Sequence, residues 1–177
     1  MRHFANVLLL VSAIAVASAA ASDKGGSSAN VQVDQRTADQ SLAIVVNQSN
    51  PITDLSFGEL RNIFLGERSH WPDGRRITLV MIESGRPERS AMLRELYHMN
   101  EAELNRHFLH ALFTGQVLVS PKTLNTPMGV CKFVFNVPGA IGFLRASDVD
   151  ESVRVIRIDG HLPQDREYSL RMPATVK

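Results

Sequence analysis

The chain has 177 residues, with 19 Lys and Arg against 18 Asp and Glu, so its formal charge at pH 7 is +1. A balance this close to neutral argues against broad electrostatic binding to nucleic acid or to anionic membrane surfaces. The length suits a single domain with a core of its own. The one cysteine, Cys131, cannot form an internal disulfide and stands in an apolar run. We therefore expect a buried structural thiol and a fold stabilised by packing.

Residues 1–21 have the pattern of a cleavable signal peptide. A polar start precedes the apolar run Phe4–Val16, and small residues follow at Ala17-Ser18-Ala19. The run is shorter than the roughly 20 residues that a membrane span needs, and no cysteine follows it to carry a lipid. A buried N-terminal helix is the alternative. The pattern predicts a periplasmic or secreted protein with no membrane span once the signal has been removed.

Residues 22–40 are rich in Ser, Ala, Gly, Asp and Gln. They contain too few apolar side chains to offset the entropy lost on ordering, which predicts a flexible leader. Gly26-Ser27-Ser28 lacks the preceding strand and following helix of a phosphate-binding loop, so a linker is the better interpretation.

The first predicted elements follow this leader. Leu42–Val46 is apolar and partly β-branched, which predicts a central strand, and Asn50-Pro51 predicts a turn. Ser56 and Glu59 form a capping box, which marks the start of a helix. An amphipathic pattern then continues to Gly66, where a glycine suits the helix end.

Two further strand and helix signals follow in the middle of the chain. Trp71–Gly74 predicts a turn with the tryptophan as a packing anchor, and Ile77–Ile82 predicts a second buried strand. Pro87 suits the first turn of a helix with an apolar stripe. Asn100 with Glu103 predicts the cap of another helix.

The C-terminal third completes the alternation. Thr126-Pro127 begins a predicted helix that ends before Pro138-Gly139, and Ala140–Leu144 and Val153–Ile158 predict the last two strands. Strands that alternate with one or two helices indicate a three-layer α/β domain over residues 41–160. Residues 161–177 are then a C-terminal tail.

The candidate binding site is a polar segment that follows a predicted strand and opens a predicted helix. The amides at a helix start attract anions, serine hydroxyls add donors, and a guanidinium suits an oxyanion. Open α/β sheets also place ligands at strand ends. An ordinary capped helix with solvated arginines is the alternative. The candidate residues are Ser84, Gly85, Arg86, Arg89 and Ser90.

Several of these segments resemble phosphate-type periplasmic substrate-binding proteins of ABC transporters. Ser84-Gly85 stands where that family has a Ser-Gly-Thr-like anion-binding segment, although no threonine follows and the arginines come after it. The most specific match is Pro138–Phe143, which reads PGAIGF and resembles a family element. The resemblance covers roughly residues 42–144 and includes Phe113-Thr114-Gly115 and Pro121-Lys122.

The resemblance implies a lobe of the type II periplasmic-binding-protein fold, a mixed sheet flanked by helices. It also implies phosphate or a related oxyanion as ligand, an ABC permease or another exported protein as partner, and no cofactor. Between the signal and Leu42 there is no room for the family's first lobe, so we expect only the second lobe. An anion bound by one lobe alone stays in contact with water, which weakens its attraction to the protein. Weak binding is therefore expected unless a partner or a second copy covers the site.

The sequence leaves one other class of function open and argues against a second. The first is a protein–protein interaction module that has lost small-ligand capture, with a homodimer among its forms. The second is an enzyme, which we do not expect because no motif connects a nucleophile to a histidine. Glu103, His107 and His110 share one helical face, but the other residues of that helix predict that this face is solvated, so no metal site is expected.

Overall fold

The computed structural model describes residues 40–172. The predicted signal peptide, residues 1–21, and the predicted leader, except for Gln40, lie outside the described residues. Within the described part of the chain, no helix combines the length and the apolarity that crossing a membrane requires.

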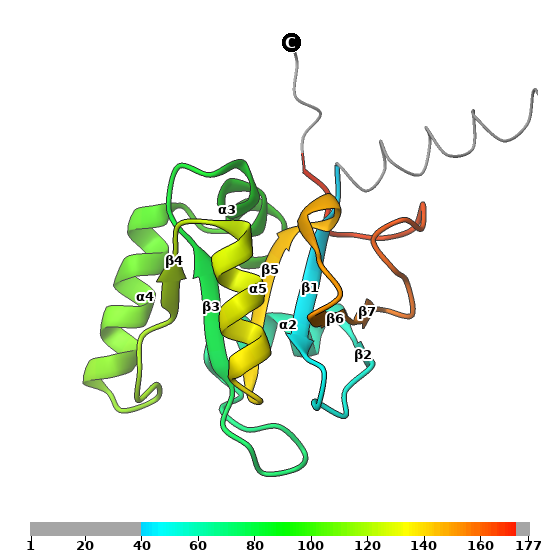
Figure 1. Cartoon of the computed structure of the whole chain (residues 1–177). Coiled ribbons are helices and arrows are strands. Elements are labelled where there is room, and N and C mark those ends of the chain that lie inside the picture. The colour runs from blue at the N-terminus through cyan, green and yellow to red at the C-terminus, as the bar shows by residue number, and fades with distance from the viewer. Residues whose placement is uncertain (1–39, 173–177) are drawn as a thin grey trace, which may run out of the picture.

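A five-stranded mixed sheet forms the centre of the domain, in the order β4-β3-β5-β1-β6 (Figure 1). Strand β3 runs parallel to β4 and β5, whereas β1 runs antiparallel to β5 and β6. A separate two-stranded sheet pairs β2 with β7 in parallel. The strands are β1 Leu42–Asn47, β2 Asp54–Leu55, β3 Thr78–Ile82, β4 Lys122–Leu124, β5 Ala140–Arg145, β6 Val153–Val155 and β7 Arg157–Ile158.

Helices cover both faces of the five-stranded sheet, and α5 crosses one of them (Figure 1). All six residues of β1 are buried, and successive side chains point to opposite faces. Leu42 and Ile44 therefore join one core cluster, and Ala43 and Val45 join the other. The three-layer α/β prediction is confirmed. The helices are α2 Phe57–Phe64, α3 Pro87–Met92, the π-helix η1 Leu93–Tyr97, α4 Glu101–Phe113, α5 Pro127–Asn136 and the 3-10 turn η2 Ala146–Asp148.

The predicted helix starts are confirmed. Ser56 and Glu59 form the reciprocal bonds of a capping box at α2, and Asn100 and Glu103 do so at α4. The Thr126 side chain accepts a hydrogen bond from the amide of residue 129 at α5. These caps depend on contacts within three residues, so the local sequence contains the whole signal.

The structure differs from the predicted strands at three places. Strand β2 has only two residues, Asp54 and Leu55, and was not predicted. Strand β4 was not predicted, because Lys122 and Thr123 are exposed at the sheet edge and no apolar alternation marks them. The single strand expected over Val153–Ile158 is divided between two sheets. At the division, the Ile156 amide donates to the Ile44 carbonyl at 3.0 Å. One short segment of sequence therefore pairs with two different strands.

The segment assigned by sequence to a C-terminal tail lies against the domain as far as Met172. Tyr168 and Leu170 are buried in the core cluster on the α2 face. The Leu42 amide donates to the Leu170 carbonyl at 2.9 Å, and the Met172 amide donates to the Gln40 carbonyl at 2.7 Å. Gln40 and Met172, the two ends of the described chain, therefore lie side by side; Figure 1 shows the arrangement of the strands around them.

Candidate functional site

The strand order fixes where a ligand crevice is expected. Parallel strands β3 and β5 are neighbours, but the chain leaves β3 toward β4 and leaves β5 toward β6, on opposite sides. Open α/β sheets bind ligands outside the carboxyl ends of strands at such a reversal. The loops after Ile82 and Arg145 meet at this point.

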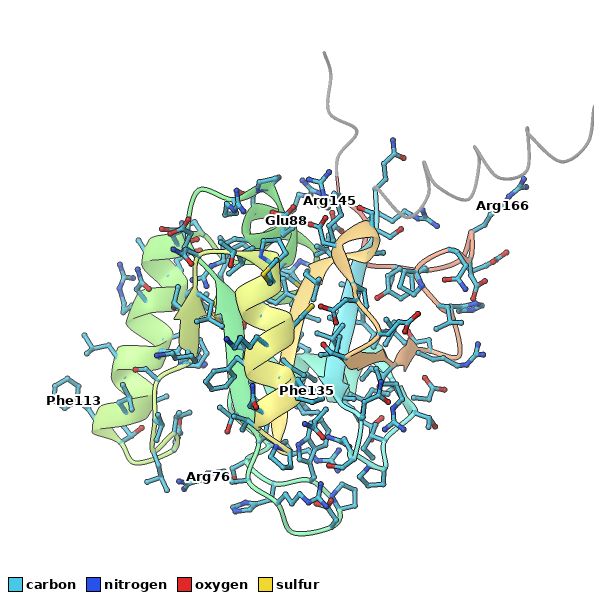
Figure 2. All side chains as sticks on the ribbon, in the orientation of Figure 1. Arg76, Glu88, Phe113, Phe135, Arg145 and Arg166 are labelled. Carbon is cyan, nitrogen blue, oxygen red and sulfur yellow. The ribbon has the colours of Figure 1, made fainter. Side chains whose placement is uncertain are left out.

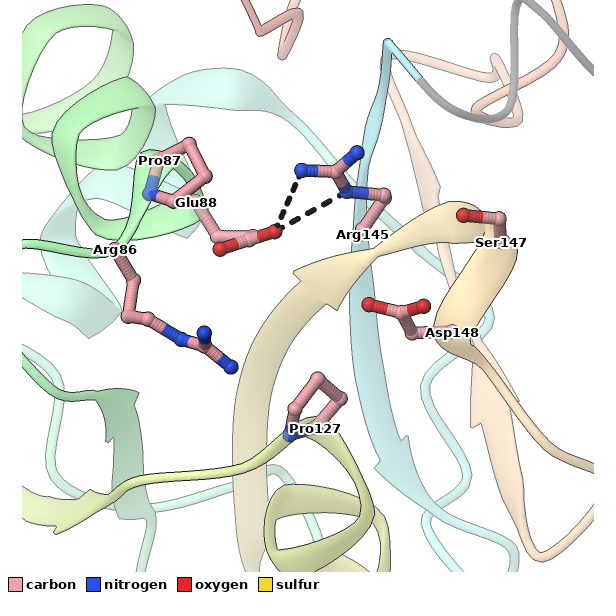
Figure 3. A pocket seen from close by; sticks show the side chains of 7 residues that line it. All are labelled: Arg86, Pro87, Glu88, Pro127, Arg145, Ser147 and Asp148. Atoms are coloured by element: carbon pink, nitrogen blue, oxygen red, sulfur yellow. Dashed lines mark hydrogen bonds and ion pairs between the residues drawn. The ribbon is translucent and has the colours of Figure 1, made fainter.

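A hollow of about 420 Å³ lies there (Figure 3). Three segments form it, namely the start of α3, the start of α5 and the turn after β5. We call it the polar hollow, because charged and hydroxyl side chains predominate in it. Its lining residues are Arg86, Pro87, Glu88, Pro127, Arg145, Ser147 and Asp148.

One wall of the polar hollow is fixed by an ion pair. Both Nε and Nη2 of Arg145 donate to Oε1 of Glu88, at 3.1 and 3.0 Å. The Glu88 side chain is only 6% exposed. A buried carboxylate is stable only with such charge-assisted partners. The pair therefore holds the start of α3 against the end of β5, and it neutralises the Arg145 charge locally.

Arg86 is the unpaired cation of the polar hollow. Its backbone is extended at the N-cap of α3 (φ −82°, ψ 141°), so its side chain does not follow the helix face. Figure 3 shows the guanidinium extending into the hollow, with Asp148 on the opposite side. The Nε atom is buried and has no hydrogen-bond partner within residues 40–172. A buried donor without a partner costs stability, so a ligand that accepted its hydrogen bond would remove that cost.

The second helix at the polar hollow contributes one backbone donor and a partial positive charge. Pro127, in the first turn of α5, has no amide hydrogen, and the Gly129 amide donates to Oγ1 of the cap residue Thr126 at 3.0 Å. The Met128 amide is therefore the donor of this turn that the helix leaves without a partner, and the helix dipole gives this end a partial positive charge. Because α5 has ten residues, this end can interact favourably with an anion in the hollow.

Only one of the five sequence-predicted site residues lines the polar hollow, namely Arg86. Ser84 and Gly85 are exposed in the preceding turn, where Gly85 adopts φ 84°. Ser90 is also exposed, and its hydroxyl donates to the Arg86 carbonyl at 3.3 Å. The five residues that the sequence suggested as one anion site therefore lie at separate positions in the structure.

Arg89 lies elsewhere, between α3 and α4. Its Nε and Nη2 donate to the two carboxylate oxygens of Glu101, each at 3.0 Å. Its Nη1 lies 2.9 Å from the sulfur of Met81, and the side chain is 8% exposed. This guanidinium therefore stabilises helix packing rather than facing the polar hollow.

Sequence reasoning missed the side of the polar hollow that Arg145, Ser147 and Asp148 form. These residues lie at the end of β5 and just after it, far along the chain from Arg86. The available signal was a run of polar residues directly after the predicted strand Ala140–Leu144. Recognising it required knowing that β5 is the parallel neighbour of β3.

Two other sets of potentially reactive side chains, the polar face of α4 and Cys131, have structural roles. His107 Nε2 lies 2.9 Å from the Leu65 carbonyl, and Glu103 accepts from the Asn100 amide at 2.8 Å. In residues 40–172, no three His, Cys, Asp or Glu side chains are arranged to hold a metal ion. Burial raises the pKa of the Cys131 thiol, which disfavours the reactive thiolate.

The fold matches that of three solved proteins. An ABC-type phosphate transport receptor from Vibrio cholerae matches with a TM-score of 0.58 and 24% identity over 70% of this chain. A putative phosphate ABC transporter substrate-binding protein with bound phosphate, from Clostridium perfringens, matches with a TM-score of 0.55 and 22% identity over 68%. PstS from Borrelia burgdorferi matches with a TM-score of 0.59 and 13% identity over 75%.

The match covers 48%, 46% and 55% of those three proteins, so the chain spans about half their length. No protein-family model matches the sequence. At these identities the likeness concerns the fold, and function has to be argued from the site.

Proposed function

We propose that this chain is a non-catalytic solute-binding protein that takes phosphate or a related small oxyanion in the polar hollow. The observation that carries the proposal is the Arg86 guanidinium, which extends into a hollow at the strand reversal with its buried Nε unpaired. A planar guanidinium matches the geometry of an oxyanion and keeps its charge at all physiological pH values. The phosphate bound by the Clostridium perfringens neighbour is consistent with this assignment.

Other groups around Arg86 complete the proposed site. The first turn of α5 supplies the Met128 amide and a partial positive charge, and the hydroxyl of Ser147 supplies a further donor. Ser84 and Gly85, exposed in the turn before Arg86, stay in the proposal as residues that would contact a ligand reaching out of the hollow. Arg89 and Ser90 would act only indirectly, through the position of α3.

The proposed affinity is modest, for an electrostatic reason. Asp148 brings a negative charge to the polar hollow, and Glu88 already holds the guanidinium of Arg145. The two arginines and two carboxylates of the hollow cancel in formal charge, so an anion would rely on its direct contact with Arg86, and water weakens each charge interaction. The same proposal includes export of the protein, delivery of the anion to an ABC permease, and a second copy that covers the site. Weak capture of an anion would be useful under these conditions.

Calorimetric titration of the full chain with phosphate at low ionic strength tests the proposal, with sulfate as a comparator. We expect saturable phosphate binding that is lost in Arg86→Gln. Arg94→Gln is the matched control, because Arg94 is exposed and pairs with its neighbour Glu95 away from the hollow. The absence of binding heat on folded protein, or equal binding by Arg86→Gln, would reject the site.

A protein–protein interaction module is the second candidate, favoured by exposed apolar side chains. Phe113 on α4 is 84% exposed, and Phe135 on α5 is 54% exposed (Figure 2). Neither lines the polar hollow, so an interface here would use different faces of the domain. Sedimentation of the full chain over a range of concentrations tests self-association. A monomer at all concentrations would argue against a homodimer.

A further inference from the structure

A second cavity lies at the other end of the sheet from the polar hollow. Its volume is about 280 Å³, and it lies beneath the loop Gly115–Ser120, beside the amino end of β3. Leu79, which is buried, and Ile77, which is half-buried, contribute to its floor. Val117 and Leu118 of the loop contribute to its roof. We call it the apolar cavity, because aliphatic side chains form its floor and roof.

The roof is anchored at one end and exposed at the other. The Val117 amide donates to the Ala111 carbonyl at 3.1 Å. A Cβ added to Gly66 would lie 2.5 Å from Cγ2 of Val117, so the loop packs closely on that glycine. Leu118 and Val119, by contrast, are each 67% exposed. A ligand at the mouth of the cavity would cover the exposed apolar surface of these two side chains, and burying apolar surface is favourable.

Three basic residues surround the apolar cavity, and two of them are engaged. Arg68 lies 3.7 Å from a carboxylate oxygen of Glu59, and Nδ1 of His70 lies 2.9 Å from the Ser69 hydroxyl. The third is Arg76, which is exposed and extends from the hairpin below the sheet (Figure 2). Within the described residues, its guanidinium forms no hydrogen bond or ion pair.

We propose that the apolar cavity binds a compact apolar carboxylate. The apolar body would lie against Ile77 and Leu79, and the carboxylate would accept a forked pair of hydrogen bonds from Arg76. The volume corresponds to roughly nine water molecules at about 30 Å³ each, which suits a ligand of about nine non-hydrogen atoms. The proposed oxyanion site lies at the opposite end of β3, so the two proposals are independent.

The ligand class follows from the combination of the two features. A bare anion such as acetate would gain the pairing with Arg76 but little from the floor. A neutral molecule of the same shape would gain the floor but not the charge-assisted pairing, which is the stronger kind of hydrogen bond. Only a molecule with both an apolar body and a carboxylate would contact the floor and Arg76 together.

Titration of the ¹⁵N-labelled full chain with benzoate, followed by amide chemical shifts, tests the proposal. We expect saturable shifts confined to residues 63–79 and 115–120. Benzamide, of the same shape but neutral, and acetate, charged but without an apolar body, should each bind about tenfold more weakly. Phosphate should leave these resonances unmoved.

A pair of variants from one hairpin makes the test specific. Arg76→Gln should weaken benzoate binding to the level of benzamide and leave benzamide binding unchanged. Arg75→Gln is the matched control, because Arg75 pairs with Asp73 at 3.3 Å and does not line the cavity. It should leave benzoate binding unchanged. Unsaturable shifts, shifts centred on other residues, or an equal loss in both variants would overturn the proposal.

Discussion

Oε1 of Glu88 accepts hydrogen bonds from both Nε and Nη2 of Arg145, a residue 57 positions later in the chain. This ion pair connects the first turn of α3 to the end of β5 and forms one wall of the polar hollow. Its carboxylate also lies beside the position where we propose that an anion binds. The same contact therefore stabilises the domain and limits its affinity for anions.

Glu88→Gln separates these two effects. The neutral amide keeps the shape of the side chain but leaves the Arg145 charge without its partner. We expect the free energy of unfolding to fall by about 1–3 kcal/mol and phosphate affinity to rise, because a negative charge has been removed. Urea unfolding and calorimetry measure the two quantities. Phosphate affinity that falls in a folded variant would contradict the proposed ligand position.

Arg89→Met tests the assignment of Arg89 to packing rather than to ligand binding. The variant removes a guanidinium that pairs with both oxygens of Glu101. Breaking a buried pair costs about 3–5 kcal/mol. We expect about 2 kcal/mol, because the Glu101 side chain is 35% exposed and can be rehydrated.

The readouts for Arg89→Met are urea unfolding and phosphate titration below the unfolding transition. Arg94→Gln, at an exposed pair, should change the free energy of unfolding by less than about 1 kcal/mol. Phosphate binding should persist in Arg89→Met. A stable variant that no longer binds phosphate would show that Arg89 contacts the ligand.

Gly139→Ala should be the most destabilising small substitution in the corner below the sheet. A Cβ at this position would lie 2.0 Å from the Arg76 carbonyl oxygen, which is backbone and cannot move aside as a side chain would. The Gly139 carbonyl also accepts a hydrogen bond from the Trp71 indole at 3.0 Å. We expect a loss of roughly 3 kcal/mol in the free energy of unfolding.

Gly58→Ala is the matched control for that substitution. No atom lies within 4 Å of a Cβ added there, and residue 58 belongs to α2. Alanine should raise the free energy of unfolding by about 0.5–1 kcal/mol through its helix propensity. Thermal unfolding of both variants measures the contrast. Equal effects would mean that the close approach to Arg76 is relieved by backbone movement.

Cys131 should react slowly with iodoacetamide in the folded protein and rapidly in urea. Burial favours the neutral thiol and raises the pKa of Cys131 in the folded state. As the pH rises, the unfolded chain therefore loses the thiol proton first. The contribution of Cys131 to the free energy of unfolding is thus fully present below the ordinary thiol pKa of about 8.5 and is lost as the pH rises above it. Cys131→Ala should reduce this alkaline loss. Equal alkylation rates in the two states would contradict the burial of the thiol.

The helix caps show where local sequence is sufficient. Ser56 with Glu59, and Asn100 with Glu103, were recognised because donor and acceptor lie three residues apart. The burial of Trp71 and Cys131 was likewise predicted correctly from local pattern and is confirmed. The strand at Lys122–Leu124 was not predicted, because an exposed edge strand of three residues has no hydropathy pattern to reveal it.

The binding segment shows the limit of the same reasoning. Sequence alone placed a polar helix start after a buried strand, and with it Arg86. It could not separate Arg86 from Arg89, because the difference depends on two partners far from that segment. Glu101 on the next helix holds Arg89, while the turn after Arg145 forms the hollow into which Arg86 extends. Secondary structure is encoded over a few residues, whereas the choice between a buried ion pair and an open binding group depends on which strands become neighbours in the sheet.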